Sequence, residues 1–118
     1  MRTSGKTGKS HLVERKKWAF VVQSRLGYSI RTTRTYWALI TAVKHPKLAG
    51  QERSVIRTLT EPDQIRVSKT DPAVYLFYRK SGKRYLCVVT KRVTSTAGFI
   101  MTAYITDRVK EGQVAWKR

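Results

Sequence analysis

The chain has 118 residues, of which 25 are Lys or Arg and seven are Asp or Glu, so its formal net charge is +18 at pH 7. This length fits one domain, and 41% hydrophobic residues are too many for a disordered polycation. No apolar stretch approaches the roughly 18 residues of a membrane span, and the N-terminus lacks a secretory apolar run, so we expect a soluble cytoplasmic protein. The one cysteine, Cys87, and the two histidines, His11 and His45, are too few for a disulfide framework or a spaced zinc site.

The positive charge is spread over the whole chain. Residues 1–34 hold nine basic residues and one acidic residue, a net +8, and residues 35–118 carry the remaining +10. A net charge this far from zero costs stability through self-repulsion and favours polyanionic partners, of which nucleic acid is the commonest. Solubility alone is a poor explanation, because Lys and Arg without matching Asp and Glu achieve it badly. We therefore expect a nucleic-acid partner and an affinity that falls steeply with salt.

The N-terminal end is predicted to differ from the rest of the chain. Residues 1–15 are expected to form a flexible basic arm, because their first ten positions contain cations and small polar residues but no large apolar residue apart from the initiating methionine. Residues 16–118 are expected to form a single domain. It begins with alternating apolar residues over 18–23 and 26–30, which predict a hairpin with Gly27 near its turn.

Two helices are predicted to follow. The apolar spacing becomes helical after Thr35, which is the expected N-cap. Pro46 is expected to end this helix close to His45, because proline disfavours helical geometry in the preceding residue. A second helix is predicted over residues 50–60 and is ended by Pro62.

The second half of the chain is predicted to be rich in strands. The expected strands cover residues 65–67, 74–79, 85–91 and 99–106, with turns at 71–72, 81–82 and 94–98. The tail from Asp107 is predicted to return as a short edge strand. This order does not alternate as a parallel α/β fold does. It predicts an α+β fold in which two helices pack on one face of a twisted antiparallel sheet.

Several motifs occur in an order that resembles a known group of nucleases. The residues that carry the resemblance are His45-Pro46-Lys47-Leu48 after a tryptophan-containing helix, Glu61-Pro62-Asp63-Gln64-Ile65 after the second helix, Ser68 with Asp71-Pro72, Val74-Tyr75-Leu76-Phe77-Tyr78, and Gly98-Phe99-Ile100-Met101-Thr102-Ala103-Tyr104. Over about residues 26–117 the chain resembles the phage and bacterial branch of the barnase, EndoU, colicin E/D and RelE-like (BECR) nuclease superfamily. The resemblance implies N-terminal helices over an antiparallel sheet and a metal-independent ribonuclease activity without cofactors, in many relatives against transfer or messenger RNA. A toxin-like role would add a cognate acidic antitoxin or immunity protein as a partner.

Metal-independent cleavage of RNA turns the 2′-hydroxyl into the nucleophile. It needs a base for that proton, an acid for the leaving 5′-oxygen, and cations or hydroxyl donors for the charge on the phosphoryl oxygens. His45 is the strongest candidate for proton transfer, because imidazole gains and loses a proton near neutral pH. The alternative is a His45 that caps the last carbonyls of the helix as a cation. His11 lies in the predicted arm and carries little weight.

Thr102 and Tyr104 are candidates on the last predicted long strand. They are two residues apart, so both face the same side of the sheet, where two hydroxyls can contact a phosphate. A basic neighbour would let Tyr104 take part in proton transfer. The alternative is that both are ordinary strand residues and that Tyr104 only finds a hydrogen-bond partner.

Basic residues cluster at the two ends of the predicted 74–91 hairpin. Arg79 and Lys91 are favoured for the scissile phosphate, because they lie in or next to strands that fix their positions, and arginine can engage two phosphate oxygens at once. The remaining candidates are expected to grip more distant phosphates or simply to be solvated: Arg53, Arg57, Lys80, Lys83, Arg84, Arg92 and Lys110. Arg53 and Arg57 alternatively pair with glutamates on their own helix.

Aromatic residues are interleaved with these cations. Tyr75 and Phe77 share one face of their strand and Tyr78 takes the other, so we expect only one of these two sets to be core. The exposed set, with Tyr85 on the partner strand, could stack on unpaired RNA bases, while core packing is the more common role for any one of these rings.

Three functions compete on these observations. The first is a metal-independent endoribonuclease, and the second is a non-catalytic RNA-binding module on the same fold. The third is a DNA-binding or virion-associated architectural protein whose charge neutralises nucleic acid. Convergence of His45, Thr102 and Tyr104 on a basic cleft is the feature that favours the first.

Overall fold

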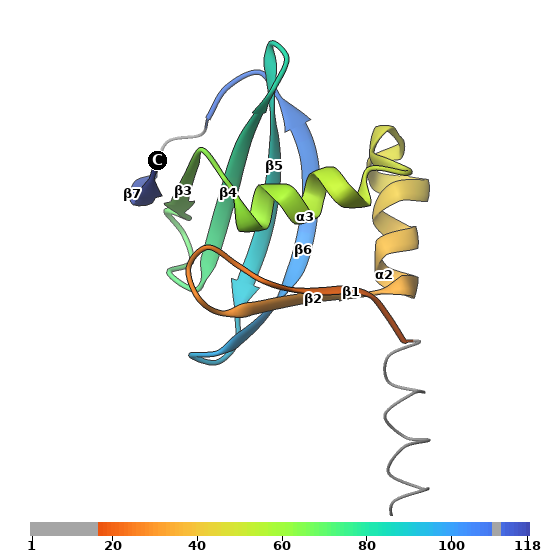
Figure 1. The fold of residues 1–118 in the computed structure, drawn as a ribbon, viewed down its shortest axis with the longest axis horizontal. Helices are drawn as coiled ribbons and strands as arrows, with labels where there is room; N and C mark the ends of the chain where they lie inside the picture. The colour runs from red at the N-terminus through yellow and green to blue at the C-terminus, as the bar shows by residue number, and fades with distance from the viewer. Residues whose placement is uncertain (1–16, 110–111) are drawn as a thin grey trace, which may run out of the picture.

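A computed structural model describes residues 17–109 and 112–118 and has an α+β fold. The predicted arm over residues 1–15 therefore lies outside the described residues. The elements are, in chain order, β1 (Trp18–Gln23), β2 (Ser29–Thr33), α2 (Arg34–Leu39), the π-helix η1 (Ile40–Lys44), the 3₁₀ turn η2 (Pro46–Leu48), α3 (Glu52–Thr60), β3 (Gln64–Val67), β4 (Val74–Ser81), β5 (Arg84–Arg92), β6 (Ala97–Thr106) and β7 (Gln113–Lys117) (Figure 1). The predicted elements are all present, including the returning edge strand. No helix among the described residues is long and apolar enough to cross a membrane.

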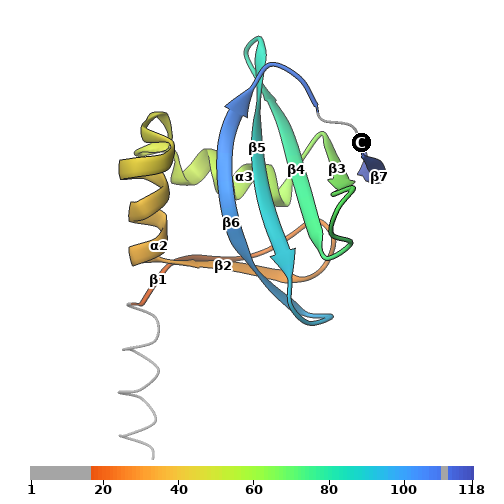
Figure 2. The same cartoon turned by 180° about the vertical axis from the view of Figure 1, so that it is seen from behind.

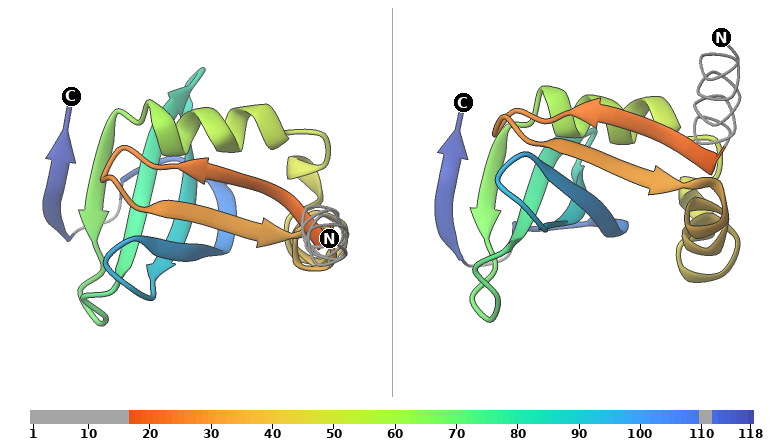
Figure 3. Two further views of the ribbon diagram at one scale, coloured as in Figure 1. Left: turned by 60° about the horizontal axis from the view of Figure 1, so that its bottom comes forward. Right: turned by 90° about the horizontal axis from the view of Figure 1, so that it is seen from below.

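The seven strands form one mixed sheet in the order β1-β2-β6-β5-β4-β3-β7. The prediction of an antiparallel sheet is wrong at one place, because β2 pairs with β6 in parallel over Ser29↔Ala97 to Arg31↔Phe99. The β1–β2 hairpin runs across the direction of β4 and β5 (Figure 3), so the sheet bends sharply where β2 meets β6. A local pattern predicts that these segments are strands, but pairing between distant segments depends on the packing of the whole chain.

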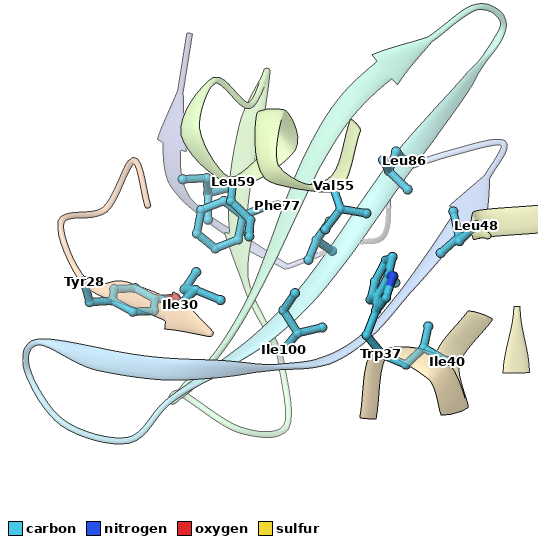
Figure 4. Packing of buried hydrophobic residues seen from close by; sticks show 13 residues of the cluster. Tyr28, Ile30, Trp37, Ile40, Leu48, Val55, Leu59, Phe77, Leu86 and Ile100 are labelled. Atoms are coloured by element: carbon cyan, nitrogen blue, oxygen red, sulfur yellow. The ribbon is translucent and has the colours of Figure 1, made fainter. Parts of the chain in front are cut away.

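The core lies between α3, the β1–β2 hairpin and one face of the sheet. Val55 and Leu59 of α3 are fully buried in the same cluster as Phe77 of β4 and Leu86 of β5 (Figure 4). The turn of the β1–β2 hairpin is attached to the end of α3, because the backbone N–H of Arg25 donates a 2.9 Å hydrogen bond to the carbonyl of Leu59. The outer side of the sheet, seen from behind, carries no helix over β4 to β6 (Figure 2).

The helix after β2 lies beside the free edge of β6 rather than over the sheet (Figures 1 and 2). Its N-cap is Thr33, whose hydroxyl accepts a 3.0 Å hydrogen bond from the backbone N–H of Tyr36, so the prediction of Thr35 as the cap is wrong by two residues. The Tyr36 hydroxyl donates to the carbonyl of Met101. This bond covers part of the edge that β6 exposes beyond its short pairing with β2.

Both faces of β4 are buried, which contradicts the expectation that only one aromatic set would be. Phe77 and Tyr78 are each 0% exposed, and Tyr75 is partly buried against the core. Tyr85 packs edge-on against Tyr78 with 6.4 Å between ring centroids, and the Nζ of Lys80 lies 5.8 Å from the Tyr85 ring. Neighbouring side chains thus cover Tyr78 on a face without a helix, and the expected stacking set is used in packing.

Candidate active site

His45 occupies a loop whose backbone is fixed on both sides. Its N–H donates a 2.7 Å hydrogen bond to the carbonyl of Ile40, and its carbonyl accepts a 3.0 Å bond from the N–H of Leu48. Ile40 is 0% exposed and Leu48 is 1% exposed, so both neighbours anchor the loop in the core. The bond to Ile40 spans five residues and closes the π-helix, a geometry that frequently occurs at functional sites. Pro46 then ends the helix, as predicted.

The fixed loop brings the His45 ring beside Tyr104. The two ring centroids are 6.0 Å apart and the rings are inclined at 42°. Tyr104 lies on β6 beyond the part that pairs with β2, so the edge of β6 away from β5 lies beside the helical segment at this point rather than beside another strand (Figure 1). The convergence of these two predicted residues is therefore present in the structure.

His45 also lines a basic pocket. The cavity has a volume of about 210 Å³ and is formed by Lys44, His45, Pro46, Lys47, Leu48, Arg84 and Ile105; we call it the His45 pocket. Three of these side chains are cations, and the described wall contains no carboxylate. Arg84 also makes a 3.1 Å ion pair with Asp107, in which both side chains are more than half exposed. An exposed pair of this kind is weak and leaves the guanidinium available to an anion.

Tyr104 holds its proton more tightly than an ordinary tyrosine. Burial raises its pKa, and the neighbouring Cys87 thiol and Tyr78 hydroxyl raise it further. Tyr104 is paired with Cys87, which in turn is paired with Tyr78, so the three side chains lie in one row across β6, β5 and β4. At neutral pH, Tyr104 is therefore suited to donating a hydrogen bond and unsuited to acting as a base.

Thr102 lies on the same face of β6 as Tyr104, opposite Val89 of β5. Its Oγ1 is shielded from solvent and has no hydrogen-bond partner among the described residues. A buried hydroxyl without a partner is uncommon and costs desolvation free energy. Thr102 therefore stays a candidate for contact with a ligand beside Tyr104.

The two cations favoured for the scissile phosphate lie elsewhere. Arg79 lines a second cavity with Arg57 and Lys80 beside α3, and its guanidinium donates to the carbonyl of Glu61. Lys91 makes a 3.2 Å ion pair with Asp71 at the far end of β5. Lys91 lies seven positions along the strand from Arg84, a displacement of roughly 23 Å. The structure therefore groups Arg84 with His45 and separates Lys91 from it.

The other predicted RNA contacts are distributed over the surface. Arg57 pairs with a glutamate, as the alternative interpretation of the sequence expected, in an exposed 3.2 Å ion pair with Glu61. Arg53 is exposed one turn earlier on α3. Lys83 is exposed in the β4–β5 turn. Arg92 lies over the Tyr28 ring, 4.7 Å from its centroid, and bonds to the carbonyl of Ser95, so it has a structural role. Lys110 lies outside the described residues.

Sequence reasoning missed Lys44 and Lys47. Lys44 precedes His45 directly and Lys47 follows it by two positions, and that proximity in the sequence is the signal that would have found them. No group of three or more His, Cys, Asp or Glu side chains within residues 17–109 and 112–118 is arranged to hold a metal ion. The described residues available for chemistry at the His45 pocket are thus an imidazole and three cations, with the protonated phenol of Tyr104 beside the His45 ring.

The chain matches no family model, no curated protein and no solved structure.

Proposed function

We propose that this chain is a metal-independent endoribonuclease of the BECR type that cleaves RNA at the His45 pocket. The observation that carries the proposal is the position of His45, which lines a cavity with Lys44, Lys47 and Arg84 and whose ring lies beside that of Tyr104. An imidazole that can carry a proton, a hydroxyl donor and clustered cations are the parts that cleavage through the 2′-hydroxyl requires. The net charge of +18 supports RNA as the substrate.

In the proposed reaction, neutral His45 removes the proton from the 2′-hydroxyl. The 2′-oxygen forms a bond to the adjacent phosphorus while the bond from phosphorus to the 5′-oxygen breaks. The leaving 5′-oxygen takes a proton from the imidazolium, directly or through water. The products are a 2′,3′-cyclic phosphate and a free 5′-hydroxyl, so no water is consumed and no electron is transferred.

The cations and Tyr104 act on the developing negative charge. Arg84 can engage two phosphoryl oxygens at once. Lys44 and Lys47, which lie before and after His45 in the sequence, add two further point charges to the pocket. Tyr104 keeps its proton, so it acts as a hydrogen-bond donor and not as a base. Preorganised donors of this type account for a large part of the rate in phosphoryl and acyl transfer.

A non-catalytic RNA-binding module is the second candidate. The observation that favours it is the position of Tyr104, whose hydroxyl is engaged in the row with Cys87 and Tyr78 and whose pKa is raised. With Arg79 and Lys91 bonded elsewhere, the pocket would then hold a phosphate without breaking a bond.

In both cases RNA is the ligand and the cytoplasm the expected compartment. An acidic antitoxin or immunity protein over the His45 pocket is the proposed protein partner.

The test is incubation of purified protein with total transfer and messenger RNA in EDTA, together with His45→Ala. Loss of the imidazole is expected to lower the cleavage rate about 100- to 10,000-fold. Val43→Ala is the matched control, because Val43 is on the same helical segment and 70% exposed. Cleavage that is absent in EDTA, or equal in wild type and His45→Ala, contradicts the proposal. Retained RNA affinity without cleavage by the wild type identifies the binding module instead.

A further inference from the structure

A third cavity opens where β2 and β6 separate. The parallel pairing of these strands ends at Arg31↔Phe99, after which the chain turns from β2 into α2. The cavity has a volume of about 340 Å³ and is lined by Trp18, Arg31, Thr32, Thr33, Tyr36, Phe99 and Ile100; we call it the Trp18 pocket. This volume lies within the range of small-molecule sites, which are typically about 300–1,000 Å³. No residue of this pocket except Phe99 and Ile100 belongs to the motifs of the predicted nuclease site.

The walls of the Trp18 pocket combine aromatic rings with cations. Trp18, Tyr36 and Phe99 supply the rings, and Phe99 is 42% exposed. The guanidinium of Arg31 lies 5.2 Å from the Trp18 ring centroid. The cations Lys17 and Lys44 lie 5.4 Å from Trp18 and 5.6 Å from Tyr36. Accessible or partly accessible rings surrounded by positive charge are the arrangement that binds unpaired bases and their phosphates in single-stranded nucleic acid.

Two polar groups in the wall have no partner. Thr32 is 3% exposed and its Oγ1 has no hydrogen bond within the described chain, and the Nε of Arg31 is likewise shielded and unpaired. A shielded donor or acceptor without a partner costs desolvation free energy, and native proteins contain few of them. Two in one small apolar pocket indicate a ligand that brings hydrogen-bonding groups as well as a flat apolar face. A nucleobase has both.

We propose that the Trp18 pocket binds one unpaired base of the RNA strand whose backbone crosses the His45 pocket. The inference rests on the proposed function and adds the class of substrate, a single-stranded segment. Lys44 joins the two pockets, because it lines the His45 pocket and its Nζ lies over Tyr36 in the wall of the Trp18 pocket. The base stacks among Trp18, Tyr36 and Phe99, while Lys44 and Arg31 contact the flanking phosphates.

Binding is measured with a short fluorescent 2′-O-methyl RNA strand, which lacks the nucleophilic hydroxyl and cannot be cleaved by the proposed reaction. An abasic strand of equal length provides the same phosphates without bases. Phe99→Ala is expected to weaken binding of the base-containing strand about five- to tenfold and to leave the abasic strand unaffected. Phe99→Trp restores a stacking ring and should recover most of the affinity. Val114→Ala is the control, because Val114 is 47% exposed and lies on β7, at the other edge of the sheet from β1.

The slope of affinity against salt gives a second measurement. Phe99→Ala removes no charge and should leave this slope unchanged. Arg31→Gln removes one phosphate contact, so it should reduce the magnitude of the slope by about one. Thr32→Val keeps the shape of the side chain and removes the unpaired hydroxyl, so it should not destabilise the fold and should weaken the base-containing strand alone.

The outcomes separate the inference from the function on which it rests. If Phe99→Ala and Thr32→Val bind the base-containing strand as wild type does, or if the abasic strand binds equally well, the inference is wrong even when cleavage occurs. Tight binding of the free mononucleotide, without a gain from the strand, shows a small-molecule site and contradicts it as well. Selective capture of an acidic aromatic peptide with unchanged RNA affinity assigns the pocket to a protein partner. If base-dependent binding is found but EDTA-resistant cleavage is not, the pocket stands and the nuclease proposal fails.

Discussion

The rings of His45 and Tyr104 lie 6.0 Å apart, one on a loop held between two buried residues and the other on the part of β6 beyond its pairing with β2. The two residues differ in what they can do with a proton. Imidazole exchanges protons near neutral pH, whereas burial raises the pKa of Tyr104 and keeps its phenol protonated. The pair therefore provides one proton carrier and one hydrogen-bond donor.

Tyr104→Phe tests this division of roles. The variant keeps the aromatic ring beside His45 and removes only the hydroxyl, so the cleavage rate is expected to fall about 10- to 100-fold, less than in His45→Ala. The shape of the pH–rate profile should not change, because a phenol that stays protonated adds no titration near neutrality. The profile is measured from pH 5 to 9 in EDTA. Loss of its acidic limb in Tyr104→Phe alone would show that Tyr104, not His45, is the base.

Arg84, and not Lys91 as the sequence suggested, is predicted to contact the scissile phosphate. Arg84 lines the His45 pocket, and Lys91 is paired with Asp71 at the other end of β5. Arg84→Gln should lower kcat about 10- to 100-fold, because it removes a charged donor from the phosphoryl group. Lys91→Gln should leave kcat within about twofold and alter only salt-dependent affinity. Steady-state kinetics on one RNA substrate check both variants, and a larger kcat loss in Lys91→Gln would contradict the assignment of the site to the His45 pocket.

The raised pKa of Tyr28 predicts that the folded protein loses stability at alkaline pH. Burial raises its pKa to about 12, although its 2.9 Å hydrogen bond with Thr90 acts in the opposite direction. Tyrosine in the unfolded chain ionises near pH 10, so the stabilisation from Tyr28 is complete below that pH and is lost as the pH rises toward 12. At pH 11 the expected loss is about 1.4 kcal/mol.

The measurement for Tyr28 is urea unfolding at pH 8 and pH 11, with Tyr28→Phe as the comparison. The variant should be less stable at pH 8 by about 1–2 kcal/mol, because Thr90 loses a buried partner. It should lose less stability than wild type between the two pH values, since it has no phenol to ionise there. Titrating lysines affect both proteins alike. Equal losses in the two proteins would show that Tyr28 does not retain its proton.

Glu52 connects the two helical segments and is predicted to matter for stability. Its Oε2 accepts a 2.8 Å hydrogen bond from the indole N–H of Trp37, which is only 5% exposed. Glu52→Ala leaves this N–H without a partner and should cost about 1–3 kcal/mol, whereas Glu52→Gln keeps an acceptor and should cost less than about 1 kcal/mol. Arg53→Ala, at the next and exposed position, should stay within about 0.5 kcal/mol of wild type in the same urea titration. Similar losses in the Ala and Gln variants would show that the bond to Trp37 contributes little.

Local sequence patterns predicted most of the helices and strands, because the formation of these elements depends mainly on neighbouring residues. The alternation over β4 and β5, the turn between them and the stop at Pro46 all follow from side-chain period and backbone geometry. The N-cap was misplaced because both Thr33 and Thr35 are chemically suitable, and only the direction in which the chain leaves β2 selects Thr33. The hydrogen bond between Glu52 and Trp37 joins two helical segments 15 residues apart in the sequence, which no local pattern predicts.

The sequence by itself determined that the chain is strongly basic, that it combines strands with two helical segments, and that His45 ends a helix just before a proline. The tertiary structure decided which of the cations share a pocket with His45, that β2 and β6 pair in parallel, and that Trp18 and Phe99 line one cavity. The physical reason is that the period of a strand fixes which residues share a face, while strand order and register are set by burial across the whole molecule. Arg84 and Lys91 are equally basic and lie on one strand, and only their distance along β5 separates their roles.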